Sequence, residues 1–216
     1  DSQDGFQYLA VSRNIYYKHE FTGPPYEFTG GVWVGKNIHM PTQVGKNGKI
    51  YSLTGIGYSL AMVPAVALSD LVYKIYHVSP SVHFPLESDW FILWAASFTN
   101  AFYASLLGVI LFLFLIKLKL SIKHALFISF VSIFTTNLFA LAKHAYAHMM
   151  FTAFLFLSFY LLREYADKKR AVFLFFSVIA YGITSVVYNQ TFVLAILPLT
   201  LYYFLLKKPA LNSNSL

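Results

Sequence analysis

From Trp90 onward, the sequence alternates long apolar runs with short clusters of lysine and arginine. Only 12% of the 216 residues are charged and 57% are apolar, whereas soluble proteins carry roughly 25% charged residues. A helix that crosses a bilayer needs about 20 apolar residues. The runs predicted to span are 90–116, 125–141, 148–162, 171–188 and 192–206. This pattern predicts an all-α polytopic membrane protein.

The basic clusters follow alternate apolar runs, at 117–123, 163–170 and 207–208. Loops rich in lysine and arginine usually face the cytoplasm. The intervening loops, 77–89, 142–147 and 188–191, then lie outside, and Lys143 is their only lysine or arginine. The net charge of +7 is thus explained by topology. Since no basic helix face with interleaved aromatic residues occurs, we expect no nucleic-acid partner.

The apolar segment 56–76 is ambiguous because it contains Pro64, Asp70 and Lys74. A charge in hydrocarbon costs several kcal/mol, so we predict an interfacial or re-entrant helix. The alternative is a full span, which would put residues 1–54 in the cytoplasm instead of outside. The expected organisation is an outer-face first loop at 1–54, the interfacial helix and a loop at 55–89, a bundle of about five spans at 90–208, and a polar tail at 209–216.

The first loop contains two recognisable local signals. Apolar residues at helical spacing from Gly5 to Ile15 predict a short helix, which Asp4 could cap. Asn47-Gly48 predicts a tight turn at 45–49, because it tolerates the positive φ of a hairpin. The sequence has no cysteine, which excludes disulfides and thiolate sites. Since the chain opens inside a polar segment, we expect a helix upstream of Asp1.

Three stretches resemble the membrane-embedded glycosyltransferases of the GT-C fold, in particular relatives of protein mannosyltransferases and aminoarabinose transferases. The first is Asp-Gly-Phe-Gln-Tyr-Leu at 4–9, which is similar to the Asp-Glu-x-x-Tyr start of that family's first outer loop. The second is Gly-Lys-Asn-Gly-Lys-Ile-Tyr-Ser at 45–52, running into a glycine-containing apolar helix. The third is 136–148, with its alternating aromatic and basic residues.

The sequence also departs from the family pattern. Gly5 stands where a Glu is common, Asn47 where an Asp is common, and Leu141 where a Tyr is usual. The spans are fewer than in complete members, which indicates a fragment or a short relative. The fold implied is a GT-C-like helix bundle whose outer-face loop carries short interfacial helices.

The resemblance implies transfer of a sugar from a polyprenyl-phosphate donor to an acceptor hydroxyl at the outer face of a prokaryotic cell membrane. The acceptor would be a glycan, a lipid or a protein. A carboxylate can take the proton of the attacking hydroxyl, and Asp4 is the predicted catalytic base. Asp1 is a competitor for that role. No cofactor is expected, and a divalent metal is possible without being indicated.

Several further residues are predicted to bind substrate. Lys143 could contact the phosphate as a point charge, or could anchor a helix end. Arg13 could contact phosphate, or could be a solvated helix residue. His144 and His148 share a helix face and could bind phosphate or sugar, ligate a metal or pack at the interface. Tyr51 could stack on the sugar, and Tyr8 is the tyrosine of the first motif.

Two other classes of function remain open. A non-catalytic polyprenyl-lipid-binding or assembly protein could have the same fold, and replacing Asp4 would then change nothing. A transporter would be expected to carry ionisable residues within its spans. The spans after Trp90 have only small polar residues at their centres, such as Thr99, Asn100 and Asn137.

Overall fold

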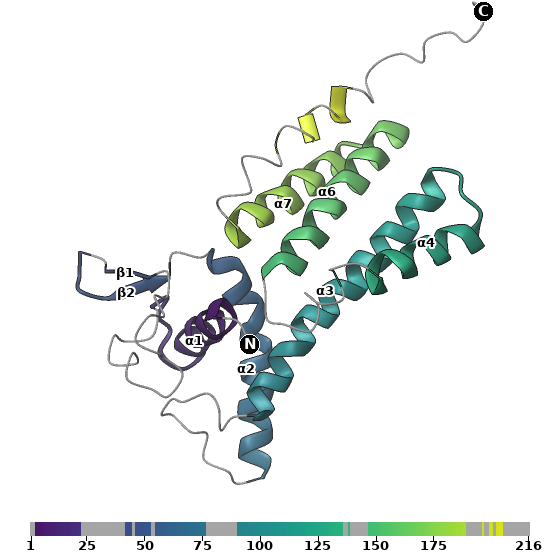
Figure 1. The fold of residues 1–216 in the computed structure, drawn as a ribbon. Helices are drawn as coiled ribbons and strands as arrows, with labels where there is room; N and C mark the ends of the chain where they lie inside the picture. Colours follow the sequence, from purple (N-terminus) through teal and green to yellow (C-terminus); the bar gives the residue numbers. More distant parts are fainter. Residues whose placement is uncertain are drawn as a thin grey trace, which may run out of the picture.

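The computed structural model describes residues 3–22, 42–44, 46–52, 55–76, 90–135, 138 and 147–188, together with 196, 199–200 and 202–204. These residues are mostly helical (Figure 1). The helices are α1 (Gln3–Lys18), α2 (Ile56–Ile75), α3 (Trp90–Lys117), α4 (Ile122–Phe134), α6 (Ala147–Lys168) and α7 (Ala171–Val187). Two strands, β1 (Thr42–Val44) and β2 (Ile50–Ser52), form a hairpin between α1 and α2.

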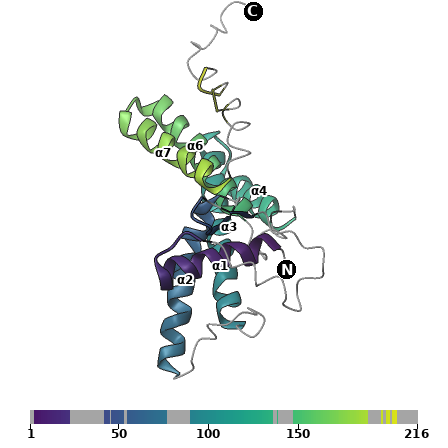
Figure 2. The same ribbon diagram turned by 90° about the vertical axis from the view of Figure 1, so that its left-hand side faces the viewer.

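Helix α3 is the axis of the molecule. Its 28 residues extend for about 42 Å at 1.5 Å per residue. Helix α2 packs along its N-terminal half, and α4 folds back beside its C-terminal part. Helices α6 and α7 form an antiparallel pair, and α6 packs against α3. Helix α1 packs across α2 (Figure 2).

Three of these helices are long and apolar enough to cross a membrane: α2, the Trp94–Lys117 part of α3, and α6. Helices α4 and α7 are apolar and shorter. Large apolar side chains such as Phe102, Val109 and Phe175 are more than half exposed. Such surface is costly in water and natural in lipid. The mostly helical, membrane-protein class predicted from the apolar runs is therefore confirmed at this level.

The predicted spans correspond to helices with shifted ends. Spans 90–116, 148–162 and 171–188 match α3, α6 and α7. The span predicted at 125–141 is wrong at its C-terminal end, because α4 stops at Phe134 and Thr135 closes it with a hydrogen bond to Val131. Most of 192–206, the loop 77–89 and the tail 209–216 lie outside the described residues.

Helix α2 continues through Pro64 without a break. Its buried carboxylate, Asp70, is well supplied with donors: Tyr16 and Tyr17 donate from α1 at 3.0 and 3.1 Å, and the Lys74 ammonium lies at 2.7 Å. Pairing of this kind lets an apolar helix keep a charge. The described contacts are therefore compatible with α2 either spanning the membrane or lying at its interface. The interfacial position stays a prediction.

The hairpin confirms the turn predicted at 45–49. Thr42 pairs with Ser52 and Val44 with Ile50 in an antiparallel register. Gly48 has φ +73°, a conformation that glycine adopts without steric cost. The Asn-Gly sequence thus sets the register of the two short strands.

Candidate functional site

Helix α1 is enclosed along its middle. Every residue from Gln7 to Arg13 is at most 8% exposed. A helix buried all round is covered on more than one side, so α1 does not lie loosely on the surface. Its first turn is therefore carried by a fixed element.

Polar and aromatic contacts lock α1 onto α2. The Ser12 hydroxyl lies 2.7 Å from the Ser59 carbonyl oxygen and 2.6 Å from the carbonyl oxygen of Tyr8, one turn before it. The rings of Tyr8 and Tyr58 meet edge to face with centroids 5.0 Å apart. The Tyr58 hydroxyl donates to Asn100 Oδ1 of α3 at 2.7 Å. One chain of contacts therefore connects α1, α2 and α3.

Around Tyr8 five helices meet in one apolar cluster, which we call the junction. It consists of Tyr8 and Leu9 of α1, Tyr58, Met62 and Val66 of α2, Ile92 and Ala96 of α3, Ala147 and Met150 of α6, and Val187 of α7. Each of them is at most 7% exposed. The junction thus joins the N-terminal end of α6 and the C-terminal end of α7 to the N-terminal half of α1.

Two glycines allow the N-terminal end of α2 to lie close against the C-terminal end of α7. A Cβ atom on Gly55 would lie 2.4 Å from the carbonyl oxygens of both Val186 and Val187. A Cβ on Gly57 would lie 2.9 Å from the Val187 side chain. Since α2 begins and α7 ends here, the positive end of one helix dipole meets the negative end of the other. Side chains at 55 or 57 would push the two ends apart.

Asp4, the predicted base, lies in the first turn of α1, four residues before Tyr8. Positions four apart share a helix face, so positions 4 and 8 lie on the same side of α1. The interpretation of Asp4 as the helix cap is wrong, because the helix begins at Gln3. The Asp4 side chain and Asp1 lie outside the described residues.

The substrate-binding residues predicted near α6 are described in part. His148 is half-buried, and its ring lies 5.1 Å from that of Tyr188, which packs against the junction. His148 and Tyr8 therefore belong to one neighbourhood, although 140 positions separate them in the sequence. Lys143 and His144 lie outside the described residues.

Tyr8 and Arg13 are more buried than the sequence indicated. Tyr8 is 1% exposed and packs in the junction, and its predicted contact with substrate stays a prediction. Arg13 is 8% exposed, so its interpretation as a solvated helix residue is wrong. Burial and then the Asp70 carboxylate raise the pKa of Tyr17 to about 12, while the charge of Arg13 opposes this. Arg13 thus lies near the polar group that Asp70 forms with Tyr16, Tyr17 and Lys74.

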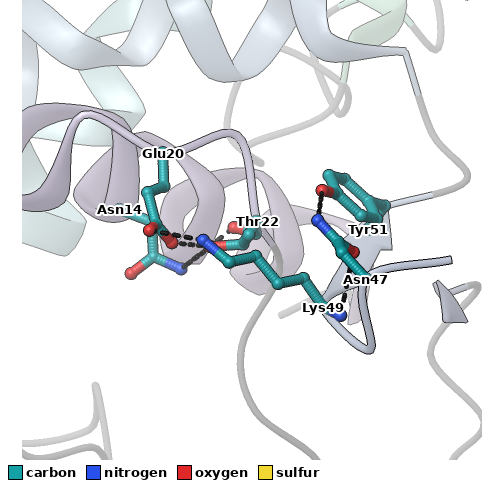
Figure 3. Close-up of polar contacts among 6 residues, drawn as sticks. All are labelled: Asn14, Glu20, Thr22, Asn47, Lys49 and Tyr51. Carbon is teal, nitrogen blue, oxygen red and sulfur yellow. Dashed lines mark hydrogen bonds and ion pairs between the residues drawn. The ribbon is translucent and has the colours of Figure 1, made fainter. Parts of the chain in front are cut away.

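A second polar group fixes the hairpin to the end of α1 (Figure 3). Lys49 Nζ lies 2.6 Å from Glu20 Oε1, and this bond holds the pKa of Glu20 below its usual value. Asn47 donates to the Tyr51 hydroxyl at 2.9 Å and accepts from the Lys49 amide at 3.1 Å. Tyr51 is therefore held at the turn, and its stacking on a sugar stays a prediction.

No local pattern predicts the Glu20–Lys49 pair, since its members lie 29 residues apart. The Tyr58–Asn100 bond could not be predicted either, because a tyrosine and an asparagine in apolar segments are common. Among the described residues, no three His, Asp or Glu side chains come together as a metal would require. His144, which was predicted as a possible metal ligand, lies outside that part of the chain.

Comparisons of the chain with protein-family models, with curated proteins and with solved structures found no match. The likeness to GT-C enzymes therefore rests on the three motifs of the sequence. What the structure adds is the surroundings of two of them, at α1 and at the hairpin.

Proposed function

We propose that the protein is a membrane glycosyltransferase that moves a sugar from a polyprenyl-phosphate donor to an acceptor hydroxyl. The acceptor oxygen attacks the anomeric carbon, and the bond from that carbon to the phosphate oxygen breaks. The leaving polyprenyl phosphate keeps the electron pair and needs no proton at neutral pH. The acceptor proton goes to the Asp4 carboxylate, the general base.

The observation that carries this proposal is the enclosure of α1 at the junction. A general base is effective only when it is held within hydrogen-bond reach of the proton that it removes. The first turn of α1, which contains Asp4, is fixed by Ser12, Tyr8 and Tyr58 beside helices long and apolar enough to cross a membrane. A lipid-linked donor would reach this site from the bilayer.

The other residues have supporting roles in the proposal. Lys143 and Arg13 would stabilise the phosphate as its charge develops. His144 and His148 would donate hydrogen bonds to phosphate or sugar, and Tyr51 would stack on the sugar ring. Under the positive-inside rule, α1 and the hairpin lie on the outer face, because the ends of α3 and α6 that carry lysine and arginine lie inside.

The test is sugar transfer in proteoliposomes that contain radiolabelled polyprenyl-phosphate donors. Asp4→Asn keeps the size of the side chain and removes the base, so turnover should fall by a factor of about 10² to 10⁴. Asp167→Asn is the matched control, since this half-exposed carboxylate lies at the far end of α6. Turnover by the control should be unchanged.

Each other outcome points to a different conclusion. If turnover survives Asp4→Asn and falls with Asp1→Asn, the base is Asp1. If no donor is turned over but donor lipid binds with the same affinity to wild type and to Asp4→Asn, the protein is a non-catalytic lipid-binding protein.

A further inference from the structure

Most of the basic residues of the bundle lie in or beside two loops at one end of it. One connects α3 to α4, the other connects α6 to α7, and ion pairs of Lys117 with α6 hold the two loops at the same end. We call the residues 117–123 and 163–170 the basic end. Seven lysines and arginines and two acids occur there, which leaves five net positive charges.

The two acids are already used inside the bundle. Glu164, whose side chain is 5% exposed, pairs with Lys117 of α3 and with Lys168 of its own helix. Asp167 lies 3.3 Å from Lys117 and 3.5 Å from Arg163. This network joins α3 to α6. No acid of the basic end is left to pair with its other bases, Lys119, Lys123, Lys169 and Arg170.

The outer bases face away from the bundle. They are exposed and make no ion pair within the part of the chain that the structure describes: Lys119, Lys123, Lys169 and Arg170. Exposed apolar side chains lie directly beside them, namely Leu118, Ile122 and Val172 at 47%, 69% and 49% exposure. Such a mixture fits the boundary between hydrocarbon and headgroups better than the surface of an acidic soluble protein.

The backbone conformation at two of these bases is a second indication that a positive charge is important at these positions. Lys119 and Lys169 both have positive φ, 66° and 54°, just past the ends of α3 and α6. Glycine is the usual residue at this position, because a side chain is disfavoured there. A lysine brings a cation to the negative end of the helix dipole and projects that charge from the loop.

We propose that the basic end binds the anionic headgroups of phospholipids in the adjacent leaflet. Clusters of four to eight lysines and arginines next to a membrane helix attract anionic lipids. The four outer bases supply the charge, and Leu118, Ile122 and Val172 enter the hydrocarbon beside the same lipids. This binding is independent of the proposed sugar transfer, which takes place at the opposite end of α6.

The test measures lipid selectivity with the protein reconstituted in phosphatidylcholine vesicles. Spin-labelled phosphatidylglycerol and spin-labelled phosphatidylcholine are compared for the fraction held at the protein surface. The wild type should prefer phosphatidylglycerol, and the preference should weaken as salt is added. Because both leaflets contain the probe, the orientation of the protein in the vesicle does not matter.

The variants use the positive φ of the two lysines. Lys119→Gly with Lys169→Gly removes two charges and relieves the backbone, so the fold is preserved. Adding Lys123→Gln and Arg170→Gln should lower the preference at least about fivefold, since each base at an anionic surface contributes roughly that factor. The control for the double glycine variant, Lys18→Gln with Lys46→Gln on α1 and the hairpin, also removes two charges and should keep the wild-type preference.

Two results would overturn the proposal. One is a wild type without preference for phosphatidylglycerol. The other is a quadruple variant that keeps the preference, which would assign it to other residues. Replacing the three lysines by arginine should retain the preference, and its loss would equally count against a role of charge.

Discussion

The close approach of α2 to α7 makes Gly55→Ala the most informative substitution. The new Cβ would lie 2.4 Å from two backbone carbonyl oxygens, whereas ordinary contact begins at 3.4 Å. The helix ends would have to separate by about 1 Å, since backbone atoms cannot rotate away. Overpacking of this kind costs about 1 to 3 kcal/mol. For a chain of this size, Tm should fall by about 2 to 12 °C.

The assay is thermal unfolding in detergent. The measured quantity is the fraction of the protein that remains monodisperse after heating. Gly182→Ala is the matched control, because its Cβ would meet nothing within 4 Å. It lies inside α7, where alanine favours the helix by about 1 kcal/mol over glycine, so its Tm should rise or stay unchanged. Gly55→Ala behaving like Gly182→Ala would refute the reasoning.

A second substitution distinguishes backbone clashes from side-chain clashes. The nearest atom to a Cβ on Gly57 is Cγ2 of Val187, at 2.9 Å. Val187→Ala removes that atom, so it should partly rescue Gly57→Ala. It should not rescue Gly55→Ala, which clashes with carbonyl oxygens. Equal rescue of both variants would contradict the described geometry, because coupling is expected only between groups in contact.

Three further predictions concern the polar contacts of α1, α2 and the hairpin. Tyr58→Phe should lower the free energy of unfolding by about 1 to 3 kcal/mol, because Asn100 loses a buried donor, and thermal unfolding measures this. The lowered pKa of Glu20 means that its pair with Lys49 stabilises the hairpin at neutral pH and is lost as pH falls through that pKa. The protection factors of the hairpin amides, which compare the measured exchange rate with the intrinsic rate at the same pH, should therefore fall at acidic pH in the wild type, and at neutral pH in Lys49→Gln. Asp70→Asn should weaken the attachment of α1 and expose its backbone to protease.

Two of these predictions have a control variant, and the third has an outcome that would contradict it. Tyr103→Phe removes a hydroxyl from α3 while leaving the Tyr58–Asn100 bond, and should change Tm less than Tyr58→Phe. Lys46→Gln removes a charge from the same turn and should leave hydrogen exchange of the hairpin unchanged. Digestion of Asp70→Asn at the wild-type rate would show that Ser12 and Tyr8 suffice to hold α1.

The sequence predicted the elements that depend on local pattern. Apolar runs of sufficient length located α3, α6 and α7, and Asn47-Gly48 located the hairpin turn. The end of α4 was missed because the apolar composition continues past Phe134, where the chain nevertheless leaves the helix. Hydropathy measures transfer into lipid and carries little information on where a helix stops.

The site was predicted less well, because its contacts join distant positions. Ser12 and Ser59 are 47 residues apart, and Tyr58 and Asn100 are 42 apart. Helical spacing from Gly5 to Ile15 predicted a helix but not the enclosure of its middle, since Gln7, Ser12 and Arg13 suggest a polar face. Their burial follows from partners on other elements, which no local pattern contains.

The buried polar contacts show what determines the position of α1. Apolar helices can slide along one another at little cost, because methyl and methylene groups pack in many registers. A buried hydroxyl, amide or carboxylate is satisfied in only one register, and the alternative is an unpaired group. Ser12 with Ser59, Tyr58 with Asn100, and Asp70 with two tyrosines each specify one register. The first and the third fix α1 along α2, the second fixes α2 against α3, and together they determine which surface the first turn of α1 faces.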